Sequence, residues 1–158
     1  MSDADYFAEA AKEARKALCL RDKCGAIVVL DGEVIGRGYN GPPQDDIACR
    51  KCCLDLVASP KPKSDRTCCV HAEWRAIIDA VRAKRDIQGS ALYFTRVDDT
   101  GDIIRSGTPY CTVCSRLALD SGIKTFALWH EDGIELYDTK DYNELSYRFH
   151  QSLPTPRK

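Results

Sequence analysis

Two short motifs constrain this chain of 158 residues more than any other feature. The first places His71 two residues before Glu73, and the second separates Cys111 from Cys114 by two residues. Apolar residues at helical spacing follow each motif, so each motif is predicted to open a helix. Histidine and cysteine are zinc ligands, and three protein ligands leave the fourth coordination position open, as in catalytic sites. The motifs therefore predict one catalytic zinc ion held by His71, Cys111 and Cys114.

The spacing within each motif also predicts where the metal lies. Cys111 and Cys114 fall on the same side of the first turn of a helix. His71 and Glu73 are about 200° apart around a helix, so they cannot share one lateral face. They converge only at the tip of the helix, where the first turn has free N–H groups. We therefore expect two helix tips to point at one zinc ion, with Glu73 as an unligated proton carrier.

Composition limits the classes of partner. The length fits one domain, and 44% hydrophobic with 30% charged residues is ordinary for a globular protein. The net charge of −1 gives no strong field toward nucleic acid or an anionic membrane. A small-molecule substrate is therefore favoured over a polynucleotide. We expect one domain over residues 1–153 and a flexible tail over 154–158.

The N-terminal residues and the cysteines indicate a compartment. The first residues show neither a basic nor an apolar region of a signal peptide, and no apolar run is long enough to span a membrane. Nine cysteines is an odd number, which argues against a disulfide framework. In a reducing cytosol, cysteine clusters more often bind metal or take part in chemistry. We therefore predict a cytoplasmic protein.

Hydrophobic periodicity predicts an α/β protein. Apolar residues recur at helical spacing and predict helices at 7–18, 71–84, 111–120 and 141–151. Short apolar runs predict strands at 26–30, 33–39, 91–95, 124–130 and 134–137. The first two strands are joined by Asp31-Gly32, a strong hairpin turn, and the last two by another tight turn. The expected architecture is a three-layer α/β/α fold with one five-stranded mixed sheet.

Between 40 and 70 the periodicity is lost. This long loop holds five of the nine cysteines, and a loop of this length in a compact domain is usually functional or pinned by another group.

The two motifs together match a known pattern, His-x-Glu followed by Cys-x-x-Cys, of zinc-dependent nucleobase deaminases. From about Phe7 to Trp129 the chain resembles the cytidine/deoxycytidylate deaminase superfamily. The Gly-Tyr-Asn-Gly stretch at 38–41 resembles that of deoxycytidylate (dCMP) deaminases. The resemblance implies a cytidine-deaminase-like fold, a zinc cofactor, and hydrolytic deamination of a cytosine-type nucleotide, in the first place dCMP to dUMP and ammonia.

The resemblance also implies roles for further residues. Asn40 is expected to contact the sugar of the substrate, and the backbone at Ala72 is expected to contact the base. Tyr110 is the expected aromatic wall of the pocket. The family implies a homo-oligomer, and some of its members carry a second, structural zinc ion under the long loop. The residues placed to bind that ion are Cys19, Cys49, Cys52 (or Cys53) and Cys69.

Three departures from the family pattern leave the substrate open. Tyr110 separates Pro109 from Cys111, whereas the family has proline directly before cysteine. Arg75 stands where dCMP deaminases usually have asparagine. The turn at 131–133 leaves no room for a helix between the last two strands, as in cytidine deaminases. Deamination of cytidine, guanine or a modified base is therefore an alternative.

An alternative of a different class is a structural zinc site. Cys49, Cys52, Cys68 and His71 have the spacing of a four-ligand knuckle, which would make the protein an interaction module without catalysis. For the enzyme, an arginine is needed to bind the phosphate of a nucleotide, because a guanidinium binds phosphate bidentately. The candidates are Arg21, Arg37, Arg75, Arg96 and Arg105.

Overall fold

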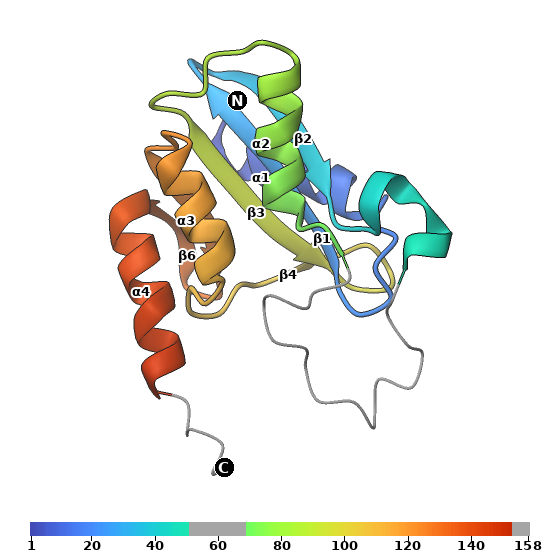
Figure 1. Ribbon diagram of the computed structural model, residues 1–158. Helices are drawn as coiled ribbons and strands as arrows, with labels where there is room; N and C mark the ends of the chain where they lie inside the picture. The colour runs from blue at the N-terminus through green and yellow to red at the C-terminus, as the bar shows by residue number, and fades with distance from the viewer. Residues whose placement is uncertain (51–68, 153–158) are drawn as a thin grey trace.

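The computed structural model describes residues 1–50 and 69–152 and centres on one mixed sheet (Figure 1). The strand order is β2-β1-β3-β5-β6, and the short β4 pairs with the end of β3. Only β3 and β5 are parallel neighbours; the other pairs are antiparallel. The strands are β1 (Lys23–Leu30), β2 (Glu33–Tyr39), β3 (Ala91–Val97), β4 (Ile103–Ile104), β5 (Thr125–His130) and β6 (Gly133–Asp138).

Helices cover both faces of the sheet, which confirms the predicted three-layer architecture. One face is covered by α1, and the other by α2, α3 and α4, which stand side by side in Figure 1. The helices are α1 (Asp3–Ala14), α2 (Ala72–Arg82), α3 (Thr112–Asp120) and α4 (Thr139–Ser152). Among the described residues no helix combines the length and apolar character that crossing a membrane requires.

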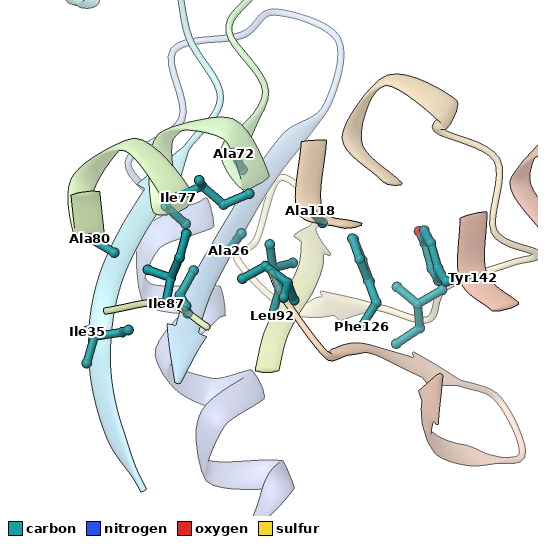
Figure 2. Packing of buried hydrophobic residues seen from close by; sticks show 14 residues of the cluster. Ala26, Ile35, Ala72, Ile77, Ala80, Ile87, Leu92, Ala118, Phe126 and Tyr142 are labelled. Atoms are coloured by element: carbon teal, nitrogen blue, oxygen red, sulfur yellow. The ribbon is translucent and has the colours of Figure 1, made fainter. Parts of the chain in front are cut away.

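The larger part of the core lies under α2, α3 and α4 (Figure 2). Ala76 and Ala80 of α2 are fully buried, and Leu92 of β3 is buried between this helix and α3. Phe126 of β5 stacks on Tyr142 of α4 with ring centroids 3.8 Å apart. Small residues on α2 bring its backbone close to the sheet, and the stacked pair attaches α4 to the same core.

Glycines in β2 allow this close approach. A Cβ at Gly36 would overlap the carbonyl oxygen of Ala76, and a Cβ at Gly38 would overlap Ala72 O and Ala76 N. The first turn of α2 therefore rests directly on the end of β2, so that the sheet sets the position of the first motif.

The first helix begins as predicted but ends earlier. Ser2 and Asp5 form a capping box, because the Ser2 side chain accepts from the Asp5 N–H and the Asp5 side chain accepts from the Ser2 N–H. Apolar spacing extended the predicted helix to Leu18, whereas α1 ends at Ala14. The Lys16 and Ala17 N–H groups still donate to the Glu13 and Ala14 carbonyls, but the Leu18 N–H donates to the Asn40 carbonyl at 3.0 Å, so the chain turns away from the helix to the end of β2.

The predicted turns are confirmed. Asp31 and Gly32 adopt positive φ between antiparallel β1 and β2, and β5 and β6 form the expected antiparallel hairpin. Within the long loop at 40–70, the structure describes short 3-10 helices over Pro43–Asp45 and Ile47–Cys49. The predicted division into one domain over 1–153 and a tail over 154–158 stays a prediction, and the tail lies outside the described residues.

Candidate metal centre and active site

The ends of α2 and α3 that begin with the two motifs meet at one point. His71 is the N-cap of α2 and Cys111 is the N-cap of α3, and neither side chain makes a capping hydrogen bond. Both side chains turn toward each other instead, and Cys114 joins them from the first turn of α3. Two helix tips converge on one point, as the spacing of the motifs predicts.

The three side chains form a compact donor cluster. His71 Nδ1 lies 3.0 Å from Cys114 Sγ and 3.6 Å from Cys111 Sγ, and the two sulfurs are 3.0 Å apart. All three donor atoms lie within 4.8 Å of one another. Among the residues that the structure describes, this is the only such group of three or more histidine, cysteine or acidic side chains.

The local electrostatics favour the metal-binding form of one thiol. A hydrogen bond from Cys114, together with His71, lowers the pKa of Cys111 to about 4, despite its burial. The hydrogen bond to Cys111 raises the pKa of His71 to about 9, against the effect of burial. Burial raises the pKa of Cys114. The thiolate is the form of cysteine that binds metal, and Cys111 is already a thiolate at neutral pH.

A zinc ion fits this donor set. One imidazole nitrogen and two cysteine sulfurs are zinc ligands, and three protein ligands leave the fourth position open, as in catalytic sites. Of the structural-knuckle alternative, Cys49 is exposed and its thiol hydrogen-bonds to Asp46 Oδ2 at 3.6 Å, whereas His71 belongs to the other cluster. Cys52 and Cys68 lie outside the described residues.

Glu73 lies beside this cluster without belonging to it. Its side chain is buried, with 5% of its surface exposed, and its carboxyl hydrogen-bonds to the Cys114 thiol. Burial, and next the negative charge of Cys111, raise the pKa of Glu73. A carboxyl group whose pKa is raised toward neutral pH can both accept and release a proton, which is the property of a general acid–base group.

Asn40 is anchored at the edge of the same region. Its Oδ1 accepts from the Cys24 N–H and its Nδ2 donates to the Asp22 carbonyl, both at 2.8 Å. An amide nitrogen carries two hydrogens, so one N–H of Asn40 has no partner among the described residues and suits a ligand. The sequence pattern did not reveal this anchoring, because it depends on the pairing of β1 with the end of β2.

The other two predicted binding residues keep positions that suit their roles. Ala72 is fully buried, and as the first residue of α2 its N–H has no partner within the helix. Tyr110 is half exposed, and its ring lies 5.8 Å from that of Phe149 in α4. Burial, and next the charge of Glu73, raise the pKa of Tyr110.

Of the predicted ligands for a second zinc ion, two lie together. The Cys19 and Cys69 side chains hydrogen-bond, and this bond lowers the pKa of Cys19 to about 5. Cys49 is exposed and is not part of a metal-binding group with them among the described residues, and Cys52 is not described.

Sequence patterns did not identify Cys24 as a residue of this region, and they left Arg96 as one of five candidate arginines. Cys24 lies opposite Arg96 in the antiparallel pairing of β1 with β3, and the charges of Glu73 and Arg96 both act on its thiol. The Arg96 charge also acts on the Tyr110 hydroxyl. Strand alternation would place Arg96 on the same face as Phe94, but only the strand order shows that this face packs toward α2 and α3.

Comparisons with known proteins agree with the geometry. Residues 1–129 match the model of the cytidine and deoxycytidylate deaminase zinc-binding region. A deoxycytidylate deaminase of Mycobacterium phage D29 is 34% identical over 128 residues, which cover 77% of this chain and 89% of the phage protein.

Solved structures share the fold. The dCMP deaminase from the cyanophage S-TIM5, solved in complex with dCMP and dUMP, aligns with a TM-score of 0.62 and 24% identity, over 94% of this chain and 93% of the phage protein. A mutant cytidine deaminase from Mycobacterium tuberculosis aligns with a TM-score of 0.55 and 16% identity, over 89% and 93% of the two chains. By its sequence match and its metal centre, this chain belongs to the cytidine and deoxycytidylate deaminase family.

Proposed function

We propose that this protein is a zinc-dependent deaminase that converts dCMP and water to dUMP and ammonia. The observation that carries the proposal is the buried Glu73 carboxyl beside a cluster of one imidazole and two sulfurs. The sequence similarity to a phage deoxycytidylate deaminase supports dCMP as the substrate.

The residues of the site divide the chemistry among them. When bound, zinc acts as a Lewis acid and lowers the pKa of water to near neutral pH. Glu73 accepts a proton from water and delivers it to the ring nitrogen, while the water oxygen bonds to the ring carbon that carries the amino group. Transfer of the remaining water proton to the amino group then breaks its bond to that carbon, and ammonia leaves. The free N–H of Asn40 orients the sugar, the N–H of Ala72 holds the base, and Tyr110 walls the pocket. Burial of Glu73 keeps its proton transfers away from bulk solvent.

A nucleotide substrate is supported by Arg96. Its neighbours Leu92 and Phe94, on the same face of β3, pack in the core under the motif helices, and Cys24, opposite Arg96 on β1, packs against the same core. Its described ion-pair partner is Asp22 at 3.6 Å, which leaves guanidinium donors for a phosphate.

Three of the other candidate arginines have described contacts. Arg37 pairs with Glu9 at 3.0 Å. Arg105 stacks on Trp129 with its Cζ 3.8 Å from the ring centroid, and its buried Nη1 has no hydrogen-bond partner among the described residues. Arg75 pairs with Asp45.

An ammonia-release assay over nucleobases, nucleosides and nucleotides tests the proposal. We expect turnover of dCMP, with deoxycytidine a much poorer substrate. Arg96→Ala is expected to raise the KM for dCMP by about tenfold or more, the value of a lost charged hydrogen bond. The matched control is Arg85→Ala, because Arg85 forms an exposed ion pair with Glu33.

Other outcomes would favour the alternatives. If the protein deaminated cytidine, guanine or a modified base but not dCMP, the proposed substrate would be wrong and the proposed deamination chemistry would stand. No turnover of any compound by the zinc-loaded protein would favour an interaction module. The Arg96 assignment would fail if Arg96→Ala raised the KM no more than the control.

We also infer that Cys19 and Cys69 contribute to a second, structural zinc site together with cysteines of the long loop, Cys49 and Cys52 being the candidates. The lowered pKa of Cys19 supports this inference, because a thiolate is the form that binds zinc. A zinc content near two per chain in the purified protein is expected, and a content near one would contradict it.

Two further proposals concern the whole protein. Exposed apolar side chains on the outer faces of α2 and α3, which include Ile78, Val81 and Leu119, support a homo-oligomer, and sedimentation in solution measures this directly. The described cysteines form no disulfide, which supports a reducing compartment such as the cytoplasm.

A further inference from the structure

The turn that follows β2 is bonded to the catalytic helix through Arg75. The Arg75 guanidinium donates from Nη1 to Asp45 Oδ1 at 2.7 Å and from Nη2 to the Pro42 carbonyl at 2.6 Å. Its side chain is only 17% exposed. Two separate donors reach two points of one turn, which is the fork geometry that distinguishes arginine from lysine.

Tyr39 completes this network. Its ring lies under the guanidinium, 5.1 Å from Arg75 Cζ, and its hydroxyl donates to Asp45 Oδ2. Both Asp45 oxygens are therefore used, one by each partner. Burial alone would raise the pKa of Asp45, but the hydrogen bonds from Tyr39 and Arg75 outweigh it and lower the pKa. Asp45 is therefore held as a carboxylate.

The backbone of the turn needs such support. Gln44 and Asp45 have φ of 55° and 59°, in the left-handed region that residues other than glycine rarely adopt. A Cβ on Gly41 would lie 3.2 Å from Asp45 Oδ1 and 3.6 Å from Arg75 Nη1, so the turn is closely packed on itself. A strained turn of this kind persists only where the surrounding contacts hold it.

The turn connects directly to the site. Gly41 follows Asn40, and it exchanges two backbone hydrogen bonds with Val70, the residue before His71. Asn40 and the zinc ligand His71 thus lie next to two chain segments that are paired with each other at Gly41 and Val70. Arg75, two residues after Glu73, ties the outer side of the same turn to α2.

We propose that Arg75 is a positioning residue for the deaminase reaction, because it locks the turn after Asn40 onto α2 and so holds Asn40 in register with Glu73. This inference rests on the proposed function. It gives a physical reason for arginine where dCMP deaminases usually have asparagine: the shorter side chain could not reach both Asp45 and Pro42. It also removes Arg75 from the candidates for phosphate binding, since its guanidinium is used within the protein.

Steady-state kinetics on the zinc-loaded full chain test the proposal. Arg75→Ala is expected to raise the KM for dCMP by about 10- to 100-fold, the effect of a small misplacement of a binding group, with a smaller effect on kcat. Asp45→Ala should produce a similar change, and the double variant should be no worse than the more affected single variant, because both remove one interaction. Arg75→Lys should recover only part of the loss. Arg85→Ala is the control.

Three further measurements separate a positioning role from simple loss of structure. The zinc content of Arg75→Ala should equal that of the wild type. Hydrogen exchange at the Gly41 and Val70 amides should become faster in this variant but not in the control. The bond from Tyr39 to Asp45 can be removed alone by Tyr39→Phe, which should give a smaller KM effect than Arg75→Ala.

Several results would overturn the inference. These are an unchanged KM in an active Arg75→Ala enzyme, equal losses in kcat and kcat/KM, fully additive effects of the two alanine variants, or loss of the zinc. A wild-type protein that deaminates nothing would instead overturn the proposed function, so the two failures are distinguishable.

Discussion

At the scale of single residues, the site depends on the hydrogen bonds of the buried Asn40 side chain. The Cys24 N–H and the Asp22 carbonyl meet at the Asn40 side chain, which satisfies one acceptor and one donor at once. The Asn40 backbone bonds in addition to Leu18 and to Cys24. A predicted sugar contact therefore has a second role, which is to fasten three segments of the chain at the edge of the site.

This dual role predicts a stability effect. Asn40→Ala is expected to lower the free energy of unfolding by about 1–3 kcal/mol, because it leaves a donor and an acceptor of the backbone without a partner. Urea denaturation of the two proteins measures the difference. Gln88→Ala, a change at an exposed residue of the 83–90 connection, is the control and should have almost no effect. Equal stabilities of Asn40→Ala and wild type would show that the anchoring contributes nothing.

At the scale of the elements, the helix tips are placed by close packing on glycines of the sheet. Gly38 lies against the first turn of α2, where Ala72 and Ala76 leave no space for a side chain. Glu73 belongs to this first turn, and His71 is the residue just before it. The packing of α2 on Gly38 therefore also sets the positions of these two site residues.

A second prediction follows at this scale. Gly38→Ala forces the new Cβ against the backbone of α2, and we expect a loss of about 1–3 kcal/mol in the free energy of unfolding, as for other overpacked sites. Since α2 must shift, the zinc content should fall as well. Gly107→Ala is the matched control, because a Cβ there meets nothing within 4 Å. Normal stability with full zinc content in Gly38→Ala would contradict this account of the packing.

Sequence patterns predicted the elements well where the signal is local. The capping box at Ser2 and the turn at Asp31–Gly32 depend on residues a few positions apart, and both are confirmed. The spacing within each motif predicted that its ligands lie at a helix tip, and the two tips do meet. The prediction was wrong about the end of α1, because the bond from Leu18 to Asn40 joins distant parts of the chain.

Contacts between distant strands also limited the prediction of the site. The sequence identified His71 and Glu73 from their spacing, but it could not choose among five arginines. Arg96 lies opposite Cys24 because β3 pairs with β1, a contact between distant parts of the chain. His130, which no motif singles out, bonds to the Ser106 carbonyl at 2.9 Å and to the Tyr137 hydroxyl at 2.8 Å, since the connection after β4 lies against β5.

At the scale of the whole molecule, the topology explains why two distant motifs meet. β3 and β5 are parallel neighbours, and α3 is the crossover between them, on the same face as α2. The starting ends of α2 and α3 therefore lie side by side at one edge of the sheet (Figure 1). The fold brings free N–H groups, metal ligands and a buried carboxyl to one place, although the motifs are far apart in the chain.

The central claim is that zinc and an unligated Glu73 act together at this place, and parallel measurement of zinc content and dCMP turnover in Glu73→Gln tests it most directly. The account predicts wild-type zinc content with turnover reduced by at least about 100-fold, since the amide cannot transfer the proton. Turnover close to that of the wild type, or loss of the zinc together with the turnover, would contradict it.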